Sequence, residues 1–340
     1  MFELLDELCA LPGVSGNEGA VRAAIRAKVT PFAEEIFEDS IGNLFVKKRG
    51  RARRRDTLMV CAHMDEVGLI VKEITDEGYL RIGCVGGVDR RVLLGKRVRI
   101  GDAGIPGIVG VRAVHLSTKE ERKSVPKLDT FYLDIGAKDA AQAKKLVSLG
   151  DAACFMGGLI RLGEDQIKGK ALDDRLGCAV MIRLLESELA YDTWFVFTVQ
   201  EEVGLRGATC AAYALEPDRA LILEGTTAAD LPGISGHRRV CELERGVVIG
   251  SMDGRTIYDH AMFETLRRLA EERNIPWQTK ELIAGGTDAG AIQQSRTGVR
   301  VASLAAPVRY LHSPACVTSL SAVRAVEALA TAFVNEGEEK

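Results

Sequence analysis

Residues 57–68 read TLMVCAHMDEVG, an apolar run that ends in a histidine and two acids. Six apolar or β-branched residues in succession, without alternation, are typical of a strand that is buried on both faces. Such strands occupy the centre of α/β sheets, and these sheets bind ligands at the carboxyl ends of their strands. The run therefore predicts a central strand that brings His63 and Asp65, two residues apart, to one face of a site.

Helical and strand patterns alternate along the chain on both sides of this run. Ser15 and Glu18 have the spacing of a helix capping box. The alternation predicts an α/β fold in three layers, with a central mixed sheet flanked by helices. The helical patterns cover residues 3–30 on both sides of 12–18, then 174–189, 207–215, 259–273 and 319–335, and the strand patterns cover 41–47, 57–62, 193–199 and 219–223.

Residues 68–165 have a different pattern. Short β-branched runs alternate there with Gly, Asp and Pro turns, and only 138–149 has a helical pattern. Many short strands at regular spacing are typical of a small β-barrel or sandwich. We therefore expect a discontinuous α/β domain, formed by residues 1–67 and 166–340, that is interrupted by an all-β module at 68–165. The expected strands of this module are 68–74, 79–84, 97–100, 107–111 and 130–135.

Composition and charge exclude several classes of protein. The chain has 45 basic and 48 acidic residues, so no overall positive charge favours a nucleic-acid or membrane partner. Its one basic run, 47–55, lies between two strand patterns and is predicted to be a solvated hairpin loop. No apolar stretch reaches the roughly 18 to 20 residues that a membrane span needs. An acidic amphipathic amino terminus and eight scattered cysteines without a C-x-x-C pair indicate a cytoplasmic protein with reduced thiols.

Four further segments contain side chains that can bind metal. Each has a structural interpretation when taken alone, such as helix capping by Asp173 and Asp174. The adjacent acids Glu201 and Glu202 are harder to explain, because like charges repel unless a cation or a proton compensates them. Together with 62–68 the segments form an oxygen and nitrogen ligand set without sulfur, which suits zinc, cobalt or manganese. The segments are GKALDDRLGC (169–178), VQEEVG (199–204), LILEGTT (221–227) and APVRYLHSP (306–314).

Seven segments resemble the M42 family of metallo-aminopeptidases, which includes the TET-type and glutamyl aminopeptidases. They occur in family order and span most of the chain. The resemblance implies an enzyme that removes amino-terminal residues from short peptides. It also implies that a PDZ-like barrel inserted at 68–165 mediates dimerisation and that dimers assemble into a dodecamer. The segments are PGVSGNE (12–18), DSIGNL (39–44), AHMDEVG (62–68), GKALDDRLG (169–177), EEVGLRG (201–207), GGTDAGA (285–291) and VRYLHSP (308–314).

Carried over residue by residue, the resemblance implies a site for two divalent ions per subunit. Zinc is expected, with cobalt or manganese as alternatives. Glu201 is implied to be the general base, and Asp65 is implied to support a histidine ligand. The implied ligands are Asp173 bridging both ions, His63 and Glu224 on the first ion, and Glu202 and His312 on the second.

Some positions depart from the family pattern or have no role in it. The family usually has Asp where this chain has Glu224, so the longer side chain must fold back or coordinate differently. Asp174 is expected to be a structural neighbour of the bridging ligand. The Gly-rich segment 285–290 is either a wall of the substrate pocket or an ordinary loop. The other histidines, His115, His237 and His260, are expected to be surface or structural residues.

Three hypotheses remain open beside the aminopeptidase. A glycosidase that uses Glu201 and Glu202 would need carboxylates facing each other across about 5–9.5 Å, and it would leave His63 and His312 without a role. A non-catalytic scaffold is suggested by the substitution at Glu224. A deacylase acting on a non-peptide amide would use the same site.

Overall fold

The apolar run that ends at Ala62 forms β3 (Leu58–His63), and every residue of this strand is buried. The computed structural model describes residues 1–337. β3 pairs in parallel with two other strands, one on each side, so it lies within the sheet as predicted. The eight-stranded mixed sheet has the order β1 (Glu35–Glu38), β2 (Leu44–Lys48), β12 (Thr193–Thr198), β3, β13 (Arg219–Thr227), β16 (Arg300–Val308), β14 (Val247–Ile249) and β15 (Trp277–Gln278).

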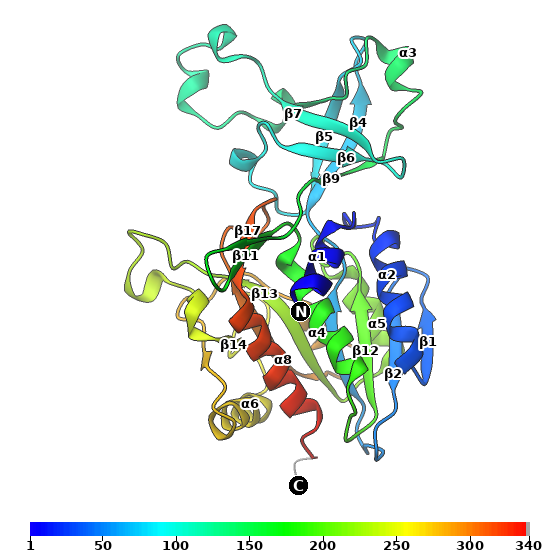
Figure 1. The fold of residues 1–340 in the computed structure, drawn as a ribbon, viewed down its shortest axis with the longest axis vertical. Coiled ribbons are helices and arrows are strands. Elements are labelled where there is room, and N and C mark those ends of the chain that lie inside the picture. The colour runs from blue at the N-terminus through cyan, green and yellow to red at the C-terminus, as the bar shows by residue number, and fades with distance from the viewer. Residues whose placement is uncertain (338–340) are drawn as a thin grey trace.

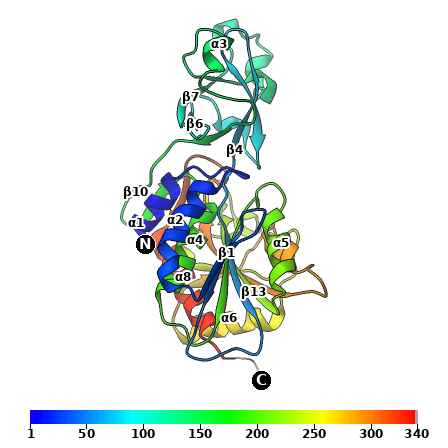
Figure 2. The ribbon, with the colours of Figure 1, turned by 90° about the vertical axis from the view of Figure 1, so that its right-hand side faces the viewer.

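Helices cover both faces of this sheet, which confirms the predicted three-layer α/β fold. On one face, apolar side chains of five helices form the largest buried cluster with the sheet. On the other face, a smaller cluster is formed with two helices (Figure 2). The first group is α1 (Phe2–Ala10), α2 (Gly19–Val29), α4 (Leu172–Glu186), α6 (His260–Glu272) and α8 (Leu320–Val334), and the second is α5 (Arg206–Leu215) and α7 (Ala289–Ile292).

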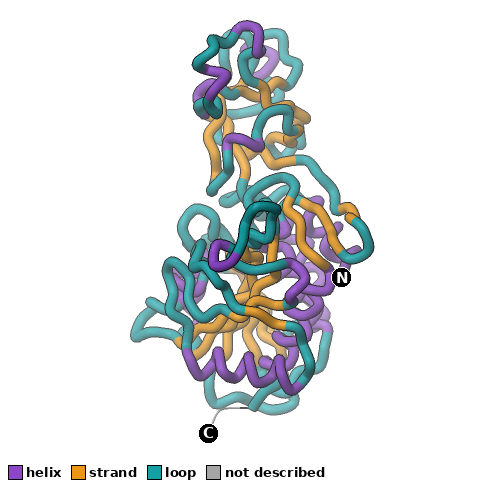
Figure 3. The backbone as a smooth tube through the Cα atoms, turned by 90° about the vertical axis from the view of Figure 1, so that its left-hand side faces the viewer, coloured by secondary structure: helices purple, strands orange, loops and turns teal. Residues whose placement is uncertain are grey.

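A closed six-stranded barrel stands apart from this α/β body, above it in Figure 1, and has its own apolar core. In Figure 3 loops and short helical turns connect the strands of the barrel, whereas long helices pack beside the strands of the body. The barrel strands are β4 (Gly68–Ile74), β5 (Leu80–Val85), β6 (Arg97–Ile100), β7 (Ile105–Gly110), β8 (Tyr132–Asp134) and β9 (Ala152–Phe155). The predicted small β-barrel is therefore confirmed.

A three-stranded antiparallel sheet lies where the chain returns from the barrel to the body. Its middle strand pairs with a strand that immediately precedes α8, so the return segment is attached to the carboxy-terminal part of the chain. The strands are β10 (Ile160–Leu162), β11 (Gln166–Gly169) and β17 (Cys316–Ser319).

Two predictions within the barrel were inaccurate. The helix expected at 138–149 is reduced to α3 (Ala140–Ala143). The barrel core accepts only Ala143 and Val147 from this segment and leaves Leu146 and Leu149 exposed, so a longer helix would gain little burial. β9 was missed because its sequence, AACF, contains no β-branched residue.

Three predictions for the α/β body were wrong or incomplete because they rested on short segments of sequence without their tertiary neighbours. The basic run is solvent-facing but connects no hairpin, since β12 lies between β2 and β3. Ser15 does not cap α2, which begins at Gly19 without a side-chain cap. β16 was missed because its sequence, RVASLAAPV, is rich in alanine and contains a proline.

Candidate metal centre

The candidate site residues converge at one edge of the sheet. His63 is the last residue of β3, Glu224 lies within β13, and Glu201 and Glu202 follow β12. These three strands are parallel neighbours, so their carboxyl ends meet. Asp173, at the start of α4, and His312, in the loop after β16, reach the same place. The chain enters the barrel from this edge, because β4 follows β3 after four residues.

Two groups of possible metal ligands meet at a shared aspartate. His63 Nε2 lies 3.3 Å from Asp173 Oδ1 and 3.4 Å from Glu224 Oε1. His312 Nε2 lies 3.6 Å from Asp173 Oδ2 and 3.3 Å from Glu202 Oε2. Within each group the candidate ligand atoms lie within 4.8 Å of one another. One oxygen of Asp173 therefore faces each group, which is the arrangement a carboxylate needs to bridge two cations.

Several carboxyl groups are buried together at this edge, and burial disfavours their charged forms. Burial raises the pKa of Glu224 and Glu201 well above the usual carboxyl range, and it raises the pKa of Glu202 to about 7. Burial acts in the same direction on Asp173, but the neighbouring imidazoles of His312 and His63 outweigh it and hold the pKa of this carboxyl below its usual value. Such a cluster is electrostatically satisfied only by protons or cations.

The chemistry of the donors fits divalent cations. Asp173 Oδ1 is buried and has no hydrogen-bond partner among residues 1–337. Two imidazoles and several carboxylates, without sulfur, suit zinc, cobalt or manganese. The nearby thiol of Cys178 is engaged elsewhere, since its Sγ bonds to the carbonyl oxygen of His63. All eight cysteines are free, as predicted.

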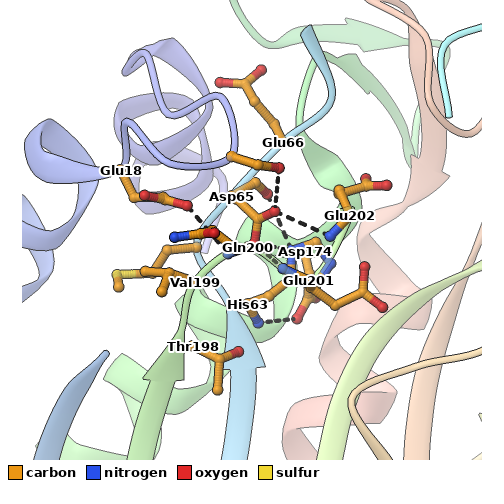
Figure 4. Close-up of polar contacts among 12 residues, drawn as sticks. Glu18, His63, Asp65, Glu66, Asp174, Thr198, Val199, Gln200, Glu201 and Glu202 are labelled. Carbon is orange, nitrogen blue, oxygen red and sulfur yellow. Dashed lines mark hydrogen bonds and ion pairs between the residues drawn. The ribbon is translucent and has the colours of Figure 1, made fainter. Parts of the chain in front are cut away.

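Asp65 connects His63 to the turn that follows β12 (Figure 4). It is fully buried, and its two oxygens accept the backbone N–H groups of Glu201 at 3.0 Å and Glu202 at 3.1 Å. His63 Nδ1 lies 3.1 Å from the Asp65 carbonyl oxygen and 3.4 Å from Oδ1. These acceptors favour a proton on Nδ1, which leaves the Nε2 lone pair directed at Asp173 and Glu224.

Asp174 takes part in neither group. Its carboxylate accepts the backbone N–H groups of His63 at 3.2 Å and Gly177 at 2.9 Å, which ties the end of β3 to the start of α4. The longer side chain of Glu224 folds back, because its Oε1 accepts the N–H of Gly225 at 3.1 Å.

Three residues at the site were missed by the sequence predictions. A Cβ at Gly225 would lie 3.2 Å from Asp173 Oδ1, so glycine lets β13 approach the shared aspartate. A Cβ at Gly87, which comes from the barrel segment, would lie 3.0 Å from His312 Nδ1. Ser15 donates its hydroxyl to Asp65 Oδ2 at 2.6 Å. The two glycines carry no local signal, because only tertiary packing makes the space for a side chain tight there.

A cavity of about 710 Å³ opens over the two groups. Gly285, Gly286 and Thr287 form part of its wall, so the Gly-rich segment does line the space next to the site. The three other histidines are exposed and outside the site, as expected: His115, His237 and His260.

A parallel-stranded edge that carries two histidine–carboxylate groups sharing one buried aspartate defines a metallohydrolase-like centre. A family model described as M42 glutamyl aminopeptidase matches residues 42–329, and the chain belongs to the M42 peptidase family. It is 39% identical over 323 residues to a putative aminopeptidase of Acetivibrio thermocellus, with 94% of each chain covered. Family membership confirms the prediction of a peptide hydrolase of the aminopeptidase class.

Solved structures share the whole fold. Aminopeptidase APDkam598 from the archaeon Desulfurococcus kamchatkensis superposes with a TM-score of 0.94 at 34% identity, covering 99% of this chain and 94% of that chain. The TET1 peptidase of Pyrococcus horikoshii, described as able to assemble into a tetrahedron or a large octahedral shell, gives a TM-score of 0.86 at 33% identity, covering 98% and 99%. Among residues 1–337 of the present chain, no helix is long and apolar enough to cross a membrane.

Proposed function

We propose that the chain is a two-metal aminopeptidase that releases amino-terminal residues from short peptides. The observation that carries this proposal is the placement of Asp173, whose two oxygens face two different ligand groups. Zinc is the expected metal, and cobalt or manganese are alternatives. The residues that would hold the first ion are His63, Asp173 and Glu224, and those that would hold the second are Asp173, Glu202 and His312.

When bound, the ions supply Lewis-acid activation of the attacking water and of the scissile carbonyl group. Glu201 acts as the general base: it accepts the proton of the water and returns it to the departing amine. Its backbone is fixed by the hydrogen bond to Asp65, and burial raises the pKa of its carboxyl well above the usual range, which strengthens it as a proton acceptor. Asp65 also orients His63 through Nδ1.

The cavity wall supports a preference for short peptides. Beyond the acidic cluster and its histidines, the charged side chains of the wall are Arg255 and Lys280, and neither forms an ion pair with another described residue. One region of the wall is therefore acidic and another carries positive charge. A peptide has a free amine at one end and a carboxylate at the other, and a peptide of a few residues brings both into a cavity of about 710 Å³.

The two parts of the chain have separate tasks in this proposal. Residues 1–67 and 166–340 form the catalytic domain, and residues 68–165 form a dimerisation domain whose dimers assemble further into a dodecamer. The ability of the P. horikoshii TET1 peptidase to form closed shells supports such an assembly. Exposed apolar side chains on the inserted segment, including Val114 and Leu116, supply surface for it. The enzyme is proposed to work in the cytoplasm.

The test is a hydrolysis assay across aminoacyl amides, short peptides, acylated amines and glycosides, with bound metal measured in parallel. Two divalent ions per chain and chelator-sensitive release of amino-terminal residues are expected. Glycoside cleavage that survives complete metal removal would support the glycosidase instead. Cleavage of acylated amines alone would support the deacylase. A single bound metal without any hydrolysis would support the scaffold.

A further inference from the structure

The loop at residues 12–18, which fails to cap α2, contacts the candidate site instead. Ser15 donates its hydroxyl to Asp65 Oδ2 at 2.6 Å, across fifty positions of sequence. Glu18 Oε1 accepts the backbone N–H of Gly16 at 2.7 Å and that of Gln200 at 3.2 Å. Two side chains of this loop therefore reach the turn that follows β12 (Figure 4 labels Glu18, Asp65 and residues 199–202).

We propose that Ser15 is a positioning residue of the peptidase reaction: its hydroxyl orients the Asp65 carboxylate and, through it, the turn that carries Glu201 and Glu202. The proposal rests on the function proposed above and adds a residue to its site. The bond to Asp65 has the length of a charge-assisted O–H···O⁻ hydrogen bond, which is stronger than a neutral one.

The hydrogen bonds of Asp65 explain how an effect can pass through it. Oδ2 accepts both the Ser15 hydroxyl and the N–H of Glu202, while Oδ1 accepts the N–H of Glu201. Without the hydroxyl, the carboxylate keeps its hydrogen bonds to the N–H groups of Glu201 and Glu202 and its contact with His63 Nδ1. Rotation of the carboxylate would then move both amides, and with them the side chains of the proposed base and of one proposed ligand.

The turn depends on such external contacts. Gln200, its first residue, has a φ of 56°, a left-handed conformation that a residue with a side chain adopts only when its surroundings hold it there. Glu18 holds the N–H of Gln200, and Asp65 holds the next two N–H groups. The loop and Asp65 thus determine the path of three consecutive residues.

A purely structural role for the hydroxyl is less consistent with these contacts. The loop is already attached to the segment after β3 by backbone bonds, from Glu66 N–H to the Gly13 carbonyl at 2.9 Å and from Ser15 N–H to the Glu66 carbonyl at 3.3 Å. The hydroxyl adds nothing to this backbone pairing. Among residues 1–337, the hydroxyl donates to the carboxylate that holds the turn.

The first test follows the turn directly and does not depend on activity. Ser15→Ala is compared with Ser15→Thr, which keeps the hydroxyl, and with Ser187→Ala, which removes a hydroxyl that donates to the Leu184 carbonyl at the end of α4. Hydrogen exchange of the peptide covering 199–206 is measured by mass spectrometry with and without added zinc. Ser15→Ala should accelerate exchange of the amides of Glu201 and Glu202 by about tenfold, the scale of one lost hydrogen bond. The other two variants should leave it unchanged.

The second test is kinetic. Ser15→Ala should lower kcat by about tenfold with KM changed less than twofold and with the wild-type metal content, because a misplaced base affects turnover more than binding. Ser15→Thr should restore kcat. In an Asp65→Asn background, Ser15→Ala should have little further effect, since the two residues act as one unit.

Unchanged exchange and unchanged kcat in Ser15→Ala would overturn the positioning role, and so would full additivity with Asp65→Asn. An equal loss in Ser15→Thr would also overturn it, because the hydroxyl would not be the relevant group. These outcomes differ from failure of the proposed function, in which the metal-loaded wild-type protein itself releases no amino-terminal residue from any peptide or aminoacyl amide.

Discussion

Glu201→Gln replaces the proposed proton acceptor by a group of nearly the same shape that cannot take up a proton. Among the described residues, Glu201 is held through its backbone N–H, which donates to Asp65, while its carboxylate lines the cavity without an ion pair. The substitution therefore removes no contact that stabilises the fold. It also removes one of several buried acids that repel one another, so the free energy of unfolding should not fall.

Turnover should fall by about 10²–10⁴-fold, the usual contribution of a general base. This loss corresponds to about 2.7–5.4 kcal/mol in the activation barrier. The assay is steady-state hydrolysis of an aminoacyl nitroanilide, with metal content and thermal unfolding measured on the same preparation. KM should change little, because proton transfer contributes to the transition state and not to binding.

The adjacent residue supplies a matched control. Glu202→Gln makes the same chemical change one position along, but Glu202 Oε2 lies 3.3 Å from His312 Nε2 within a proposed ligand group. Metal content and turnover should therefore fall together in Glu202→Gln, whereas Glu201→Gln should keep both ions. Turnover of Glu201→Gln within threefold of wild type, or loss of metal from it, would refute the reasoning.

Four further outcomes are expected. Chelation should abolish activity and lower the unfolding temperature more at pH 8 than at pH 5. Burial raises the pKa of Glu202 to about 7, so in the chelated protein the stabilisation from its proton is fully present below 4.5, the ordinary pKa of a glutamate, and is lost as pH rises through 7. An equal drop at both pH values would contradict this. Glu224→Asp should keep metal in a competitive chelator titration, and the loss of one buried methylene should lower the free energy of unfolding by about 1 kcal/mol. Loss of the metal would show that the folded-back conformation of the longer Glu224 side chain is required. Asp259→Ala removes the cap of α6, which accepts the Met262 N–H, and should cost about 1–2 kcal/mol at pH 7 in denaturant unfolding without affecting turnover. The hydrogen bond to Arg300 lowers the pKa of Asp259, so this deficit should shrink as pH falls below 3.8, the ordinary pKa of an aspartate, and a constant deficit would disprove the link. Lys280→Met should raise KM several-fold for a tripeptide with a free carboxyl terminus but not for its carboxyl-terminal amide, and equal KM changes would exclude Lys280 from carboxylate binding.

Local sequence patterns predicted most of the α/β body. Continuous apolar runs identified β3, β12 and the first half of β13, because central strands are buried on both faces and need no alternation. The same reasoning missed β16, whose alanines are suited to close packing and carry little strand propensity. It also joined β2 to β3 as a hairpin, because insertion of β12 between them is decided by a segment more than a hundred residues away.

The identities of the candidate site residues could likewise be read from short motifs. His63, Asp173, Glu202 and His312 each occur in a segment whose residue types suggest a ligand. Their grouping could not be read in this way, because it depends on which oxygen of Asp173 faces which histidine. Ser15 is the clearest case, since its spacing to Glu18 matches a helix cap and its hydroxyl in fact reaches Asp65.

The amino-acid sequence alone specified an α/β chain with an inserted barrel and an acid- and histidine-rich site, because strand burial, turn chemistry and ligand type are properties of short segments. Tertiary structure decided how the segments combine: that Asp173 lies between two groups, that Gly87 of the barrel segment borders His312, and that an amino-terminal loop holds the turn at 200–202. These arrangements join residues separated by tens to hundreds of positions, and only packing and long-range hydrogen bonds bring them together.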